Sequence, residues 1–186
     1  MKLFKKPAFA VLLVLLLVVS STLLSADRKL NSSCNKVTDG FYSGFRFNGS
    51  LHPSIAGSLK ELASISETMS AIGSNYGMET EALSSETAAL RKSLAAESRD
   101  AEALYAQYDS IYSKLLLLEN DLNSSGLSAR HSEQMQQLSA DLLTVKSDID
   151  QAGYNERVTS FLRENDRFPT RQFANLFHIA FPTYFA

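Results

Sequence analysis

The N-terminal part of the chain carries a run of apolar side chains. No polar side chain interrupts Ala8 to Val19, three lysines precede the run, and hydroxyl residues dilute it before Asp27. A cleaved signal peptide has a basic start and a short apolar stretch of this kind. A retained membrane anchor needs about 17–25 residues, and residues 8–26 supply 19. The pattern leaves both alternatives open, and both send the rest of the chain across a membrane.

Residues 27–50 differ from the segments on either side. Turn-forming residues are frequent there, which favours a linker rather than a helix. They are Asn31-Ser32-Ser33, Asp39-Gly40 and Asn48-Gly49-Ser50. We therefore divide the chain into an anchor or signal segment (1–26), a linker (27–50), a helical domain (51–169) and a C-terminal segment (170–186).

Apolar positions recur at helical spacing through the helical domain. Steps of three and four predict helices over about 53–73, 79–122 and 128–167. The second of these contains no Gly or Pro, and its apolar stripe keeps the period of about 3.5 residues that is typical of coiled coils. The stripe consists of Leu83, Thr87, Leu90, Leu94, Glu97, Ala101, Leu104, Tyr108, Ile111, Leu115, Leu118 and Leu122. We expect an all-α fold, an antiparallel bundle of three to four helices with long coiled-coil-like helices, preceded by one N-terminal transmembrane helix.

Glu97 is the charged residue on this stripe. It is either a buried carboxylate that sets the helix register or binds a partner, or a side chain that reaches the edge of the bundle or pairs with a basic residue. The pattern favours the second interpretation.

Composition excludes several classes of function. The 186 residues hold 18 basic and 20 acidic side chains, so charge gives no reason to expect a nucleic-acid partner. The single cysteine, Cys34, excludes an internal disulfide framework and a zinc site with two thiolates, and we expect it to be an unmodified thiol. The histidines, His52, His131 and His178, belong to no metal-binding or catalytic motif. We therefore predict no enzymatic activity, no catalytic or metal-binding residue and no cofactor.

The C-terminal segment has no formally charged side chain after Arg171 and is rich in aromatic residues. A four-residue spacing predicts that its first three phenylalanines share one helical face. The segment either packs onto the bundle or forms an aromatic surface that docks at a membrane or on a partner. The candidate contact residues are Phe173, Phe177, Phe181, Tyr184 and Phe185.

The C-terminal region resembles that of LemA-family proteins. In the family's block a Tyr-Asn pair is followed, fourteen residues after the tyrosine, by a Phe-Pro pair. A short apolar stretch then ends in Tyr-Phe. The corresponding residues here are Tyr154, Asn155, Phe168, Pro169, Tyr184 and Phe185. Leu51 and Pro53 are placed like the family's Leu-x-Pro block at the start of a helix. The chain departs from the family in having no tryptophan and in having residues 27–50 where a further amphipathic helix is usual.

The resemblance implies an N-terminal membrane segment and a helical bundle outside the cytoplasm, without an assigned enzymatic activity. It favours the retained anchor. We therefore expect a single-pass bacterial envelope protein, with its bundle on the periplasmic side, that acts by contact with the membrane or with an unidentified protein. A second copy bound through residues 83–122 is a further possible partner. The alternatives are a secreted oligomeric scaffold released by signal cleavage and a small metal-binding or enzymatic bundle.

Overall fold

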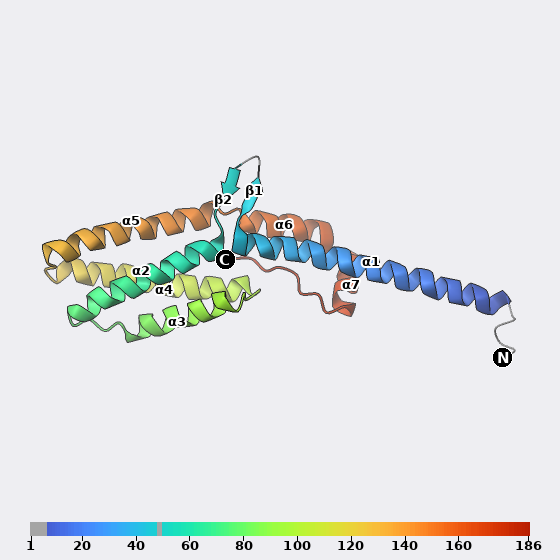
Figure 1. The fold of residues 1–186 in the computed structure, drawn as a ribbon, viewed down its shortest axis with the longest axis horizontal. Helices are drawn as coiled ribbons and strands as arrows, with labels where there is room; N and C mark the ends of the chain where they lie inside the picture. The colour runs from blue at the N-terminus through green and yellow to red at the C-terminus, as the bar shows by residue number, and fades with distance from the viewer. Residues whose placement is uncertain (1–6, 48–49) are drawn as a thin grey trace. The chain divides into compact units, whose positions relative to one another are not determined.

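The computed structural model describes residues 7–47 and 50–186, which fall into two compact units. One unit takes the residues up to 36 together with 159–181, and the other takes 37–158 and 182–186. The elements are α1 (Pro7–Ser43), β1 (Phe45–Phe47), β2 (Ser50–His52), α2 (Ile55–Asn75), α3 (Glu81–Ala95), α4 (Ala101–Ser124), α5 (Ala129–Gln151), α6 (Tyr154–Asn165) and α7 (Thr170–Leu176) (Figure 1). The predicted helical bundle is confirmed, and β1 and β2 add a short antiparallel hairpin.

Helix α2 is the centre of the bundle, since it contacts α3, α4 and α5 (Figure 1). Small buried residues such as Ala63, Ser66 and Gly73 lie among its larger apolar side chains and allow the neighbouring helices to approach closely. The helix begins after Ser54, whose Oγ accepts a hydrogen bond from the backbone N–H of Gly57 at 2.9 Å. This agrees with the helix predicted over 53–73, although Leu51 lies in β2 and Pro53 precedes the cap.

The prediction of one helix over 79–122 is wrong, because α3 ends at Ala95 and α4 begins at Ala101. Glu97 adopts the left-handed region with φ 48°, and the Asp100 side chain caps α4 by accepting from the N–H of Ala103. The step from Leu94 to Ala101 is seven residues, so a reversal of the chain keeps the spacing of a continuous heptad pattern. Periodicity alone therefore concealed the turn.

The two helices bury their apolar stripes inside the bundle. Leu90, Leu104, Ile111 and Leu115 are at most 1 % exposed. The stripe is therefore buried within the bundle of one chain, and a second copy could bind to it only if the bundle opened. Glu97 lies exposed in the turn, which agrees with the interpretation that it is not a buried carboxylate.

The prediction that the third helix continues past Gly153 is also wrong. Helix α5 ends at Gln151, Gly153 has φ 66°, and α6 begins at Tyr154. Glycine adopts this backbone conformation without the Cβ clash that other residues meet, so it ends α5 and changes the direction of the chain. At the other end of α5, Ser128 caps the helix by accepting from the N–H of His131.

The linker predicted over 27–50 is helical as far as Ser43. Leu30, Cys34, Val37 and Phe41 recur at steps of four and three, and all are buried. The segment is helical despite its turn-forming residues, because the burial of this apolar stripe stabilises a helix more than the local residue propensities disfavour it. Asn48 and Gly49, predicted to form a turn, lie outside the described residues.

The N-terminal part of α1 exposes its apolar side chains. From Leu13 to Val19 each is 42–62 % exposed. Among the helices formed by residues 7–47 and 50–186, none combines the length and the hydropathy that crossing a membrane requires. Residues 1–6 of the predicted anchor lie outside the described residues.

Candidate functional site

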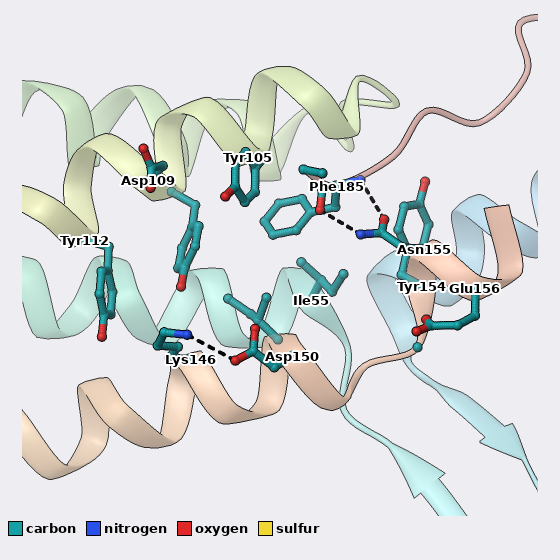
Figure 2. A pocket seen from close by; sticks show the side chains of 14 residues that line it. Ile55, Tyr105, Asp109, Tyr112, Lys146, Asp150, Tyr154, Asn155, Glu156 and Phe185 are labelled. Carbon is teal, nitrogen blue, oxygen red and sulfur yellow. Dashed lines mark hydrogen bonds and ion pairs between the residues drawn. The ribbon is translucent and has the colours of Figure 1, made fainter. Parts of the chain in front are cut away.

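A cleft of about 430 Å³ opens between α4, α5 and the first turn of α6 (Figure 2). Its lining combines tyrosine rings with charged side chains. Tyr105, Tyr108, Asp109 and Tyr112 come from α4, Lys146 and Asp150 from α5, Asn155 and Glu156 from α6, and Phe185 from the C-terminal segment. All of these residues belong to the same compact unit.

The tyrosines form a row because their spacing of three and four residues places them on one face of α4. The ring centroids of Tyr105 and Tyr108 are 5.9 Å apart, and those of Tyr108 and Tyr112 are 5.6 Å apart. Figure 2 shows Tyr105 and Tyr112 extending from α4 towards the space above α5. Tyr108 is 7 % exposed, whereas Tyr105 and Tyr112 are half-buried.

Burial raises the pKa of the Tyr108 hydroxyl to about 12, and the neighbouring Tyr112 and the carboxylates of Asp150 and Asp109 add to the rise. The hydroxyl is therefore neutral at physiological pH. In the described part of the chain, the buried side-chain oxygen and nitrogen atoms without a hydrogen-bond partner are Ser70 Oγ and Gln107 Oε1, and the Tyr108 hydroxyl is not among them. Tyr108 lines the cleft, so its hydroxyl is available to a bound group.

Charged side chains surround the tyrosine row. Lys146 Nζ and Asp150 Oδ2 form an ion pair at 3.2 Å, with side chains 49 % and 62 % exposed. Asp109 and Glu156 are exposed and take part in no ion pair among residues 7–47 and 50–186. Three carboxylates and one ammonium group leave the rim net negative.

The C-terminal segment closes one side of the cleft. Asn155 Nδ2 donates to the carbonyl oxygen of Phe185 at 3.0 Å, and Asn155 Oδ1 accepts from the N–H of Phe185 at 2.9 Å (Figure 2). The Phe185 ring is 4 % exposed and lies 5.2 Å from the Tyr105 ring and 5.6 Å from the Phe41 ring. The Tyr154 hydroxyl donates to the carbonyl oxygen of Thr183 at 3.0 Å, and burial raises the pKa of Tyr154 to about 12.

The predicted contact residues of the C-terminal segment are divided between the two compact units. Phe185 is a core residue, which agrees with the interpretation that the segment packs onto the bundle, and Tyr184 is 41 % exposed. The shared helical face is wrong, because α7 ends at Leu176 and Phe181 lies beyond it. Phe173 and Phe177 are half-buried, and Phe181 packs edge-on against Phe161 at 5.2 Å.

The Phe-Pro pair of the family-like block lies in the other compact unit from Tyr154 and Asn155. Phe168 is 83 % exposed and is joined to Pro169 by a cis peptide bond. Pro169 lines a groove beside α1 together with Phe173. The structure therefore gives the Tyr-Asn pair a packing role at the cleft and leaves the Phe168 ring on the surface.

The three histidines have different surroundings. His52 Nδ1 is 3.1 Å from the carbonyl oxygen of Gln151, and His131 Nδ1 is 2.9 Å from the Tyr76 hydroxyl. His178 is exposed in the C-terminal segment. In the part of the chain that the structure describes, His, Cys, Asp and Glu side chains form no group of three or more that could hold a metal ion.

Comparison with family models, with curated proteins and with solved structures returned no match for this chain. Sequence reasoning missed the cleft because it assigned Tyr108 only to the apolar stripe. The available signal was the spacing of Tyr105, Tyr108 and Tyr112 on one face of a helix.

Proposed function

We propose that this protein is a membrane-anchored, LemA-like helical bundle on the extracytoplasmic side, and that it acts by contact with a protein or a membrane surface rather than by catalysis. The resemblance in Tyr154-Asn155, Phe168-Pro169 and Tyr184-Phe185 supports the family assignment and the location. The anchor rests on the N-terminal apolar segment.

The exposed apolar surface of α1 is the observation that carries the proposal. Consecutive leucines and valines from Leu13 to Val19 face outwards all around the helix, which in water leaves a large apolar area unburied. The hydroxyls that follow are satisfied by the helix itself: Ser21 Oγ and Thr22 Oγ1 both donate to the carbonyl oxygen of Val18, at 2.9 and 2.8 Å. Such bonding lowers the cost of placing hydroxyl groups in lipid.

Alkaline carbonate extraction of membranes tests the anchor. We expect the unmodified chain to stay in the membrane pellet and to keep residues 1–26 by intact mass. The Leu15→Lys/Leu16→Lys variant should move largely to the soluble fraction, because each lysine costs about 2.5–3.5 kcal/mol at the centre of a membrane helix. Leu116→Lys/Leu117→Lys is the matched control, since these leucines of α4 are 45 % and 66 % exposed. Soluble protein that begins near Thr22 or Asp27 would contradict the anchor and favour the secreted alternative.

Site-specific crosslinking tests the contact role. A photoreactive benzoylphenylalanine in place of Tyr184, which is 41 % exposed, should crosslink to lipid or to a protein in intact cells. The same group in place of Asn120, exposed on α4, is the control and should not. Equal crosslinking from both positions, or none from Tyr184, would rule out the C-terminal segment as the contact element.

A further inference from the structure

We propose that the tyrosine-lined cleft binds a small organic cation that carries an ammonium group. The inference goes beyond the proposed contact role and does not depend on membrane anchoring. It rests on three features of the same cavity: a row of aromatic rings, a tyrosine hydroxyl in its wall, and a rim of net negative charge.

The tyrosine rings supply the apolar and electrostatic complement to such a cation. The π face of an aromatic ring is negative, and ammonium groups, quaternary ones in particular, bind where several rings converge. Tyr105, Tyr108 and Tyr112 line the cleft with neighbouring centroids less than 6 Å apart. The cavity volume of about 430 Å³ lies within the range of small-molecule sites.

The Tyr108 hydroxyl supplies a polar contact. It belongs to a residue that is 7 % exposed and that lines the cleft. Because the pKa of Tyr108 is raised to about 12, the group stays a neutral hydroxyl whose oxygen accepts a hydrogen bond. The carboxylates of Asp150 and Asp109 line the same cleft.

The charges on the rim favour a cation over an anion. Lys146 is the basic residue of the lining, and its ammonium group is already paired with Asp150 at 3.2 Å. Asp109 and Glu156 have no ion-pair partner among the described residues and remain available to a positive ligand. An anion would meet three carboxylates here and would have to displace the existing ion pair.

Titration of the full chain in maltoside micelles with choline tests the inference, and 3,3-dimethyl-1-butanol serves as the neutral isostere. Tyrosine fluorescence reports binding directly, because the chain has no tryptophan. We expect saturable binding of choline, at least about tenfold tighter than that of the neutral isostere, and weaker at high salt. Equal binding of the two compounds, or no saturation by choline, would overturn the proposal.

Two variants, Asp109→Asn and Tyr112→Leu, locate the site, and Asp121→Asn is the control. Asp109→Asn should weaken choline binding about three- to tenfold, since it removes an exposed charge beside the ring row. Asp121→Asn, an exposed aspartate on the same helix outside the cleft, should change the affinity less than about twofold. Tyr112→Leu should weaken binding about fivefold or more while unfolding cooperatively like the parent chain. Unchanged affinity in both Asp109→Asn and Tyr112→Leu would place the binding elsewhere and overturn the assignment.

The ammonium group can belong to a free metabolite or to a lipid headgroup. A short-chain phosphatidylcholine, added below its micelle concentration, distinguishes these sources. If the phosphatidylcholine binds more tightly than choline and Asp109→Asn weakens its binding, the ligand is a lipid headgroup. If it binds no more tightly than choline, the ligand is a free cation. Both results require choline itself to bind at the cleft.

Discussion

At the scale of single residues, the buried hydroxyl groups of α2 differ in whether they have a partner. Ser66 Oγ lies 2.7 Å from Thr87 Oγ1, and Thr87 itself donates to the carbonyl oxygen of Leu83 at 2.8 Å. Ser70 Oγ is also buried but has no partner among the described residues. The polar position that Thr87 occupies on the apolar stripe is thus explained by Ser66 across the helix interface.

Replacing the two serines by alanine should have opposite effects on stability. Ser66→Ala removes a buried hydrogen bond and should lower the free energy of unfolding by about 0.5–1.5 kcal/mol. Ser70→Ala removes a hydroxyl that lost its hydration on burial and gained no hydrogen bond in exchange. This variant should raise the free energy of unfolding by about 1 kcal/mol. Urea denaturation of the two variants measures both values. A loss from Ser70→Ala as large as that from Ser66→Ala would mean that Ser70 is satisfied.

Asn155 joins the start of α6 to the C-terminal segment through two hydrogen bonds with the backbone of Phe185. Asn155→Ala should lower the free energy of unfolding by about 1–3 kcal/mol, because both polar groups of Phe185 lose their partner. Hydrogen exchange should show faster exchange of the Phe185 amide. Asn120→Ala, at an exposed position of α4, is the control and should change stability by less than about 0.5 kcal/mol. An unchanged exchange rate of the Phe185 amide in Asn155→Ala would contradict the hydrogen bond between Asn155 and the backbone of Phe185.

At the scale of elements, α3 and α4 form a helical hairpin. Across the interface Glu86 accepts hydrogen bonds from Lys114 and Ser110, and the bond from Lys114 holds the pKa of Glu86 below its usual value. Gln107 of α4 donates to Ser93 of α3 at 3.4 Å. These pairs join residues on either side of the turn at 96–100 and so define an antiparallel register.

The turn itself contains a strained position. Glu97 has φ 48°, which costs a residue with a side chain about 1 kcal/mol. Glu97→Gly should therefore raise the free energy of unfolding by about 0.5 kcal/mol, after the larger chain entropy of glycine is counted. Glu102→Gly, in the first turn of α4, should lower it by a similar or larger amount. Both are measured by urea denaturation, and a loss of stability in Glu97→Gly would argue for a continuous helix.

Several elements were predictable from the sequence because they depend on local patterns. The apolar stripes of the bundle and the helix over about 53–73 follow from spacing alone. The break at Glu97 could not be predicted from spacing, since a turn that preserves heptad spacing leaves no gap in the pattern. The helix through residues 27–43 was missed because its stripe of Leu30, Cys34, Val37 and Phe41 lies among turn-forming residues.

At the scale of the whole molecule, stability depends on keeping buried tyrosines neutral. Burial raises the pKa values of Tyr108 and Tyr154 to about 12, from 10 in the unfolded chain. The unfolded chain therefore ionises first as the pH rises, and the free energy of unfolding falls between pH 10 and pH 12. Below pH 10 these two groups have no effect on the pH dependence.

Ultraviolet titration of tyrosinate measures this directly. Of the 7 tyrosines in the chain, we expect Tyr108 and Tyr154 to ionise near pH 12 or together with unfolding. Tyr108→Phe and Tyr154→Phe should each remove one group from this late phase. A single transition near pH 10 for all tyrosines of a still folded chain would contradict their burial.

The sequence by itself determined which faces of the helices are apolar, because helical periodicity is a local property that survives in any packing arrangement. It also determined the uncharged stretch of residues 8–26 on which the proposed anchor rests. Only the tertiary structure decided where the long pattern reverses, that residues 27–43 are helical, and that Phe185 is a core residue tied to Asn155. Only it could bring three tyrosines of α4, two charged residues of α5 and the C-terminal segment to one cleft. Contacts between segments so far apart in the chain depend on packing, which no local pattern encodes.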